Sequence, residues 1–180
     1  LEINGQHIGP ATKAQVSYLP DRMYFADWMK ATDLFDLFRD FYQDFDYDKA
    51  LAMCRSLGVE PKDRLKSMSK GTKEKVQLVL VMARKAQLYL LDEPIAGVDP
   101  AARDFILHTI LTNYNEDGTV LISTHLIADI EKVLDEVIFL KSGRIMLHST
   151  VDDIRERQGK SVDALFREIF KAQPLEGGLY

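Results

Sequence analysis

Asp92, Glu93 and His125 are the side chains of this sequence best suited to hold a metal ion and move a proton. Asp92 and Glu93 directly follow the apolar run "LYLL", and His125 follows "TVLIST" further along the chain. Short apolar runs bounded by turn signals predict buried strands, and ligands of parallel α/β sheets bind at the carboxyl ends of the strands. An Asp there can hold the Mg²⁺ of a nucleotide, a Glu can orient or deprotonate water, and an imidazole can contact a terminal phosphate. Together they are candidates for a site that binds a metal ion and phosphate, although a strand ending in exposed acids and a structural histidine would also explain the pattern.

Two predicted helix starts add candidates for binding an anion. Ser69 and Gly71 precede a long predicted helix, and free amides at a helix N-terminus suit a phosphate. Asp99 precedes Pro100 at the start of another predicted helix. Each position also has an ordinary structural explanation, because Ser and Asp cap helices and Pro favours the first helical turn. Local pattern alone therefore leaves both interpretations open at these positions.

The elements that would position these side chains alternate in type along the chain. The first part, 1–19, is predicted to be β-rich with a turn at Asn4-Gly5, and helical periodicity follows to about residue 86. After that point, strands and helices alternate, which predicts a parallel sheet covered by helices. The later predicted elements are helices at about 101–114 and 126–134, a hairpin turning at Ser142-Gly143, and amphipathic helices at about 150–157 and 161–171.

Composition and charge exclude several classes of protein. The 180 residues carry a net charge of -5, which argues against a nucleic-acid surface because such surfaces are usually basic. The one cysteine, Cys54, excludes an internal disulfide. No apolar run approaches the roughly 20 residues that span a bilayer. The chain begins without Met, so we expect residues to be missing upstream.

The order of the motifs resembles the ATP-binding subunit of a bacterial ABC transporter. "LYLLDEP" is similar to Walker B with its catalytic Glu, "AGVDP" to the D-loop, and "STH" to the H-loop with its switch histidine. "MSKGT" occupies the place of the signature motif, and "VSYLPD" resembles the segment that leads into the Q-loop. Each motif is weak by itself, but their shared order and spacing are specific, and they extend over almost the whole chain.

The sequence departs from the family pattern at three places. Within the signature, Lys70 replaces the first Gly and Thr72 replaces the Gln, which adds a positive charge close to a phosphate. Asp21 stands where the Q-loop Gln is expected; a carboxylate can serve a metal but cannot donate a hydrogen bond when ionised. No G-x-x-x-x-G-K-[ST] occurs in the 180 residues, although that Walker A loop holds most of the phosphate charge. We therefore expect the 180 residues by themselves to be inactive.

The resemblance implies an α/β fold with a RecA-like P-loop NTPase core that is N-terminally incomplete. The core, with a mostly parallel sheet and a β-hairpin, would comprise residues 1–24 and 87–150. A helical signature subdomain would occupy 25–86, and a helical extension would occupy 151–180. This extension is similar to one common in bacterial export subunits, and it favours export.

The resemblance also implies the roles of the residues and the partners. ATP and Mg²⁺ would be the ligands. Asp92 and Asp21 would bind the metal, and Glu93 and His125 would be the catalytic pair. The nucleotide-binding set would be Ser69, Lys70, Gly71 and Asp99. Two such subunits would pair head to tail and join a transmembrane permease subunit at the cytoplasmic face of the membrane.

Two alternatives stay open at this point. The first is an ABC ATPase outside transport, such as a translation or DNA-repair factor, although those usually bring tandem domains, coiled coils or basic surfaces. The second is a degenerate regulatory module that binds a partner without hydrolysis. The variant signature and Asp21 favour the second alternative, whereas the complete set of Asp92, Glu93 and His125 argues against it.

Overall fold

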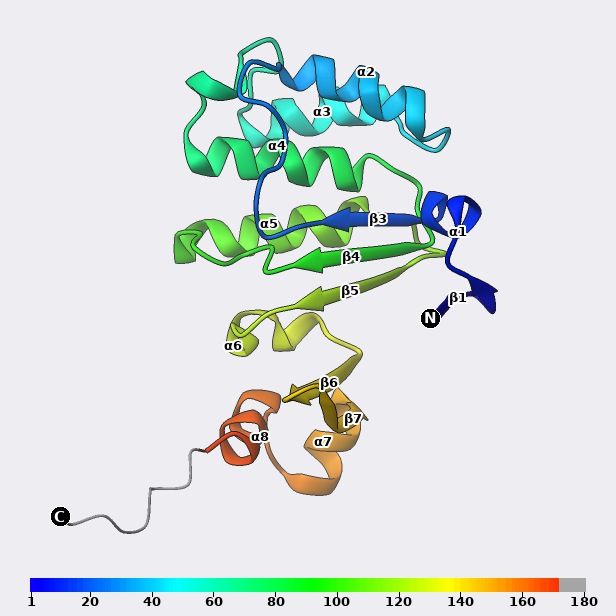
Figure 1. Cartoon of the computed structure of the whole chain (residues 1–180). Helices are drawn as coiled ribbons and strands as arrows, with labels where there is room; N and C mark the ends of the chain where they lie inside the picture. The colour runs from blue at the N-terminus through cyan, green and yellow to red at the C-terminus, as the bar shows by residue number, and fades with distance from the viewer. Residues whose placement is uncertain (172–180) are drawn as a thin grey trace, which may run out of the picture. The chain divides into compact units, whose positions relative to one another are not determined.

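The strands that carry the candidate residues form a parallel sheet in the computed structural model, which describes residues 1–171 and, at Ala101, the backbone alone. The chain divides into two compact units, Leu1–His125 and Leu126–Tyr180. In the first unit the sheet has the order β3-β4-β5, formed by Val16–Leu19, Leu88–Asp92 and Thr119–Ser123 (Figure 1). Both neighbouring pairs are parallel, as the alternating sequence pattern predicts.

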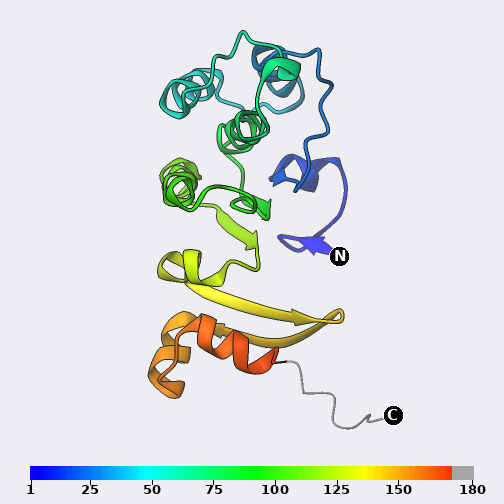
Figure 2. The same cartoon turned by 90° about the vertical axis from the view of Figure 1, so that its left-hand side faces the viewer.

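Helices α4 (Lys70–Met82) and α5 (Pro100–Asn113) lie on the same side of this sheet (Figure 2). The alternation along β4 explains the contact, because Tyr89 and Leu91 are buried while Leu88 and Leu90 are only half-buried. Tyr89 donates a hydrogen bond to the Arg84 carbonyl and accepts one from the backbone N–H of Asn115. The sheet is thereby attached to the ends of both helices.

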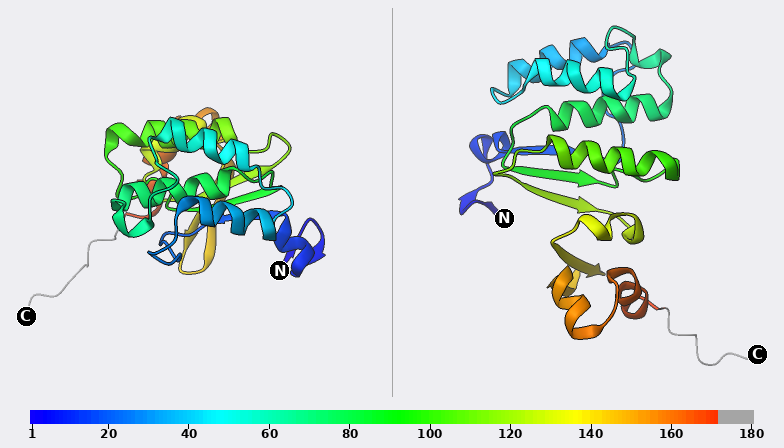
Figure 3. Two further views of the ribbon diagram at one scale, coloured as in Figure 1. Left: turned by 90° about the horizontal axis from the view of Figure 1, so that it is seen from above. Right: turned by 180° about the vertical axis from the view of Figure 1, so that it is seen from behind.

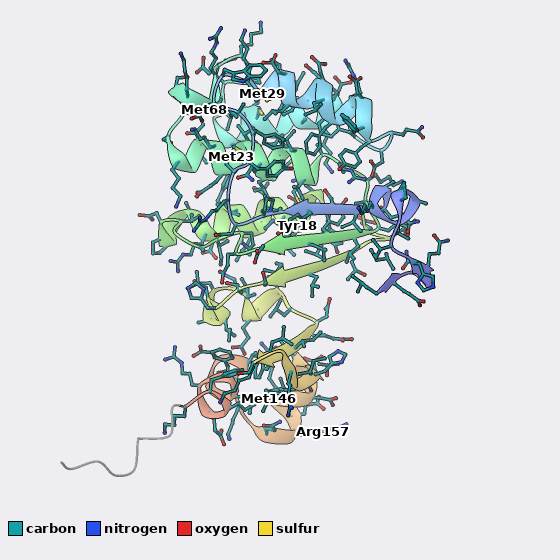
Figure 4. The ribbon with its side chains drawn as sticks, viewed as in Figure 1. Tyr18, Met23, Met29, Met68, Met146 and Arg157 are labelled. Carbon is teal, nitrogen blue, oxygen red and sulfur yellow. The ribbon has the colours of Figure 1, made fainter. Side chains whose placement is uncertain are left out.

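The opposite face of the sheet retains apolar side chains in contact with solvent. Tyr18 on β3, labelled in Figure 4, is 52% exposed, and Leu121 on β5 is 51% exposed. The two residues are aligned across the sheet, since both are in register with Leu90. One face of this sheet is therefore a packed interior and the other is largely open within the first unit.

A layer of three helices follows β3, with α2 (Ala31–Phe41) and α3 (Tyr47–Leu57) packed beside α4 (Figure 3). The local sequence explains their limits. Asp46 caps α3 by accepting a hydrogen bond from the Lys49 N–H at 2.8 Å, and Gly58 ends it in the left-handed conformation. Helix α4 begins at Lys70, so Gly71, predicted to precede the helix, lies inside its first turn.

The first nineteen residues are only partly β-structure, which corrects the sequence-based expectation. Strands β1 (Glu2–Ile3) and β2 (Gln6–His7) form the predicted small hairpin, whose turn holds Asn4 at a positive φ. A short helix, α1 (Pro10–Ala14), then intervenes before β3. Pro10 at its first position suits a helix start, a signal that the alternation around it obscured.

Arg84 joins the helical layer to the sheet through one buried side chain. Its guanidinium is 2% exposed and binds the Asp44 carboxylate, with 3.0 Å between Nε and Oδ1. It also donates to the backbone carbonyls of Val16 and Ala14. The ring of Tyr42 lies 3.7 Å from the guanidinium carbon. A planar guanidinium can serve all these partners at once, so Arg84 ties the turn between α2 and α3 to the start of β3.

The second unit begins with α6 (Ile127–Ile130) and continues into the antiparallel hairpin of β6 (Glu136–Lys141) and β7 (Arg144–Thr150). The helices α7 (Val151–Gln158) and α8 (Val162–Ile169) follow. Phe139 lies 5.4 Å from the Phe166 ring at an edge-to-face angle. The hairpin thus packs against the C-terminal helices around a core of its own, formed by Ile127, Val137, Phe139, Val151, Ile154, Val162 and Leu165.

Most predicted elements are found near their expected limits. The helix expected at 126–134 is shorter, because α6 passes into a 3₁₀ turn over Glu131–Val133. No helix within residues 1–171 is long and apolar enough to cross a membrane. The three-part division into core, helical subdomain and extension stays a prediction, and part of its extension, 172–180, lies outside the described residues.

Cys54, on α3, provides a direct test of how tightly this helix is packed. The side chain is fully buried, and burial raises the pKa of its thiol to about 11. Because the thiolate is the reactive form, we expect Cys54 to react with an aromatic disulfide reagent at pH 8 only after the chain unfolds in urea. Rapid reaction of the folded chain would contradict this packing.

Candidate active site

The ends of β4 and β5 bring the three predicted catalytic side chains together. Asp92 is the last residue of β4 and is in register with Ser123, the last residue of β5. Glu93 follows Asp92, and His125 comes two residues after Ser123. Because parallel strands end at the same edge of a sheet, side chains far apart in sequence become neighbours here.

Glu93 and His125 are in direct contact. The distance from His125 Nδ1 to Glu93 Oε1 is 2.8 Å. The second carboxylate oxygen, Oε2, accepts a hydrogen bond from the Thr124 hydroxyl at 3.1 Å. The Glu93 side chain is 25% exposed, whereas that of His125 is 68% exposed. The carboxylate is thus held on both oxygens and still reaches solvent.

The backbone at Glu93 has a conformation that residues other than glycine seldom adopt. Its φ is +49°, which lies in the left-handed region. The backbone N–H of Glu93 donates to the Ser123 carbonyl at 2.9 Å, so the strand pairing holds the residue in place. Strained backbone of this kind persists where surrounding contacts enforce it, and it is concentrated at functional sites.

Asp92 has a hydroxyl partner of its own. Ser123 donates a hydrogen bond to Asp92 Oδ1 at 2.5 Å. Each of the two acids is therefore bound by a hydroxyl: Asp92 by that of Ser123, the last residue of β5, and Glu93 by that of Thr124, the next residue. Sequence reasoning treated Ser123 and Thr124 only as part of the "STH" motif, and their contacts depend on the strand register.

The protonation of His125 decides which contacts its ring can make. A neutral ring that donates from Nδ1 to Glu93 leaves Nε2 as an acceptor, which would repel a phosphate oxygen. A protonated ring donates from both nitrogens. While Glu93 is ionised, His125 can therefore donate to it and to a phosphate together only as the imidazolium.

A cavity of about 170 Å³ opens beside these acids within the first unit. It contains Asp92 and Glu93 on one side and the start of α4 on the other. Its lining is formed by Leu19, Pro20, Asp21, Lys70, Glu74, Lys75, Gln77, Leu78, Asp92, Glu93, Pro94, Ala96, Gly97 and Ile106. The structure thus brings residues of the predicted Q-loop, signature, Walker B and D-loop segments to one cavity.

Lys70 projects from α4 toward the loop that follows Glu93. A side-chain carbon placed on Gly97 would lie 3.8 Å from the Lys70 ammonium, and Gly97 itself has a φ of +70°. Lys70 also lies 3.7 Å from the Glu74 carboxylate, one helical turn away. Its positive charge is therefore present at the same cavity as the carboxylates of Asp92 and Glu93.

Ser69 is the N-cap of α4 and Gly71 lies in its first turn. The Ser69 hydroxyl accepts from the Thr72 N–H at 3.2 Å and lies 2.8 Å from the Thr72 hydroxyl. The capping explanation therefore holds for Ser69. Both Ser69 and Gly71 are exposed, so this helix start is also accessible to an anion.

Asp21 lines the cavity, whereas Asp99 lies at the start of α5. Both residues are exposed. The Asp99 carbonyl accepts hydrogen bonds from the backbone of Ala102 and Arg103, which confirms its position at a helix start. Across residues 1–171, no group of three or more His, Cys, Asp or Glu side chains is arranged to hold a metal ion by itself. The metal role of Asp21 and Asp92 stays a prediction.

The donor chemistry at Asp92 nevertheless fits Mg²⁺. This ion is commonly held by one or two carboxylates, with waters and substrate phosphates completing its shell. Asp92 supplies one carboxylate at the strand end, with Oδ1 oriented by Ser123. A dedicated cage of three protein ligands is therefore not required.

Comparison with known proteins decides the family. The family model described as "AAA domain, putative AbiEii toxin, Type IV TA system" matches residues 16–128, more than half of the chain. The chain belongs to this AAA-domain family. The matched segment contains every residue proposed above for the site.

The relatives of this AAA-domain chain are ATP-binding proteins of ABC transporters. It is 28% identical over 158 residues to an uncharacterised ABC transporter ATP-binding protein of Synechocystis sp., covering 83% of this chain and 45% of that protein. It is 30% identical over 129 residues to the phosphonates import ATP-binding protein PhnC 2 of Halalkalibacterium halodurans, covering 70% and 52%. The sequence-based resemblance is confirmed, and the chain spans about half the length of these relatives.

A solved structure confirms the fold class. The structure described as an ATP-binding subunit of an ABC transporter matches with a TM-score of 0.74 and 26% identity. The match covers 89% of this chain and 70% of that chain. The AAA-domain chain therefore has the α/β P-loop fold of ABC ATPases, as predicted.

Proposed function

We propose that this AAA-domain chain is the hydrolytic part of an ABC transporter ATP-binding subunit. The observation that carries the proposal is the 2.8 Å contact between Glu93 and His125 beside Asp92, at the ends of two adjacent parallel strands. A base, an imidazole and a metal-binding carboxylate at one sheet edge are the groups that phosphate hydrolysis needs.

Each of the three side chains has a distinct role in this proposal. Glu93 orients and deprotonates the attacking water, and His125 holds one oxygen of its carboxylate in place. His125, as the imidazolium, stabilises the negative charge of the terminal phosphate in the transition state. Asp92 holds Mg²⁺, which when bound would neutralise charge on the phosphates.

The remaining site residues act between subunits in this proposal. Two subunits pair head to tail, and Ser69, Lys70 and Gly71 reach the terminal phosphate of the nucleotide bound by the partner. The exposed start of α4 supports this role, because its amides and Lys70 are accessible. Asp99 contacts the opposing subunit and links the two sites. Asp21 does not act between subunits and instead supplies a second carboxylate to the metal.

A transmembrane permease subunit is the proposed membrane partner, and it would place the chain at the cytoplasmic face of the membrane. The predicted C-terminal extension, which includes helices α7 and α8, supports export, because it is similar to one common in bacterial export subunits. The Halalkalibacterium relative is named for import, so it gives no support for export. The proposal of export therefore rests on the extension alone. An adjacent open reading frame with about six apolar 20-residue segments would support transport over a non-transport ATPase.

The 180 residues by themselves are expected to bind MgATP far more weakly than a complete ABC ATPase. They contain no Walker A motif, and each charge-assisted hydrogen bond from such a loop contributes about 1.5–3 kcal/mol. The absence of three or four of them lowers affinity by about four decades. Isothermal titration calorimetry checks this, and micromolar binding by the 180 residues would contradict it.

The test of function uses the longest natural polypeptide that carries these 180 residues. We expect Mg²⁺-dependent release of inorganic phosphate from ATP, with dimers accumulating when hydrolysis is blocked. Binding of MgATP without any turnover would instead support the regulatory module. The two outcomes are distinguished by measuring phosphate release and nucleotide binding on the same preparation.

A further inference from the structure

The hydroxyl of Thr124 binds the oxygen of the Glu93 carboxylate that His125 does not contact. Thr124 Oγ1 donates to Glu93 Oε2 at 3.1 Å, while the other oxygen of the same carboxylate lies 2.8 Å from His125 Nδ1. The two contacts come from consecutive residues after β5. The two contacts hold the Glu93 carboxylate from two directions, one on each oxygen. Together they set the orientation of its remaining lone pairs.

We propose that Thr124 is a positioning residue for ATP hydrolysis, which fixes the Glu93 carboxylate in the orientation that activates water. The inference rests on the proposed function of Glu93 as the base. It adds a residue that contacts neither nucleotide nor metal in that proposal and acts only through Glu93.

Several features of the site make this hydroxyl suited to positioning. A side chain misplaced by about 1 Å can lower a rate by about 10²-fold. Glu93 is partly exposed, so its long side chain would otherwise sample several rotamers. Thr is β-branched and stiff at χ1, and Thr124 is half-buried, so its hydroxyl is itself held in place.

The hydrogen bond from Thr124 to Glu93 is not needed to pair the ends of β4 and β5. The pairing beyond Asp92 is made by backbone groups, because the Glu93 N–H donates to the Ser123 carbonyl. Two other hydroxyls of the first unit serve the backbone: Ser17 donates to the Val81 carbonyl and Thr112 to the His108 carbonyl. Thr124 instead binds a carboxylate, as its neighbour Ser123 does, and its replacement should leave the strand register intact.

The experiment compares Thr124→Val, Thr124→Ser and the matched control Thr112→Val in the longest natural polypeptide that carries the chain. Val preserves the shape of Thr and removes the donor. We expect Thr124→Val to lower kcat for ATP by about tenfold to a hundredfold, the value of a hydrogen bond to a charged group. KM for MgATP should change by less than about threefold, because the lost interaction serves the transition state.

The two other variants exclude a general structural effect. Thr124→Ser retains the hydroxyl and should restore kcat to within about threefold of wild type, since it lacks only the methyl that stiffens χ1. Thr112→Val removes an exposed helical hydroxyl and should leave kcat and KM unchanged. A drop in kcat that Ser does not rescue, or one accompanied by a matching rise in KM, would overturn the positioning role.

A double substitution tests whether Thr124 acts through Glu93. In a Glu93→Gln background, Thr124→Val should lower the residual rate by less than about twofold, because residues acting as a unit are not additive. A full additional loss would overturn the inference while leaving Glu93 as the base. Absence of wild-type ATP hydrolysis would instead overturn the proposed function, and the role of Thr124 with it.

Discussion

Replacing Glu93 with Gln is expected to lower ATP turnover by about 10²–10⁴-fold, the contribution of a general base, and to trap an ATP-bound dimer. The amide cannot take a proton from water, yet it has nearly the same shape as the carboxylate. Its carbonyl can still accept from Thr124, as the Glu93 oxygen does now. Binding should therefore survive while chemistry stops.

Phosphate release and size-exclusion chromatography with MgATP measure the two halves of this prediction. Glu136→Gln is the matched control, because Glu136 also lies 2.8 Å from a histidine, His148, on the exposed hairpin. That variant should keep wild-type turnover. Turnover near the wild-type rate in Glu93→Gln would show that Glu93 is not the base.

Replacing Arg84 with Ala is expected to lower the free energy of unfolding by about 3–5 kcal/mol, the loss seen when one partner of a buried ion pair is removed. The truncation leaves the Asp44 carboxylate without its guanidinium, and that carboxylate is only 27% exposed. The carbonyls of Val16 and Ala14 lose their donor as well. Lys cannot replace the planar fork of Arg, so Arg84→Lys should also be clearly destabilised.

Urea denaturation followed by circular dichroism measures this loss. Arg39→Ala is the control, since Arg39 pairs with Asp36 at 2.7 Å and lies over the Tyr47 ring, but on the surface. Exposed pairs contribute about 0–1 kcal/mol, so this variant should remain close to wild type. Equal losses in the two variants would contradict the role assigned to Arg84.

Much of the local structure could be predicted from sequence because its causes are local. The apolar run before Asp92 and its counterpart before His125 became parallel strands, as the alternation of elements indicated. Gly58 ended its helix because only a residue tolerant of positive φ fits there. Local signals failed at α1, where a single turn of helix interrupts a segment with strand-like alternation.

The candidate site was predicted in outline and completed only by the tertiary structure. Motif order indicated Asp92, Glu93 and His125, since their residue types follow strands that end at one edge. It did not indicate the hydroxyl donors Ser123 and Thr124, because their partners are set by the register between β4 and β5. The shared cavity of Asp21, Lys70 and Glu93 likewise depends on how α4 packs beside the sheet.

The sequence by itself determined the strands, most helices and the identity of the acidic pair with its histidine, because periodicity and turn chemistry act over a few residues. Tertiary structure alone decided which atoms meet: the two oxygens of Glu93 on Thr124 and His125, and the buried fork of Arg84 across 68 residues of chain to Val16. Such contacts join segments distant in sequence, and their geometry is set by strand register and packing, which no local pattern encodes.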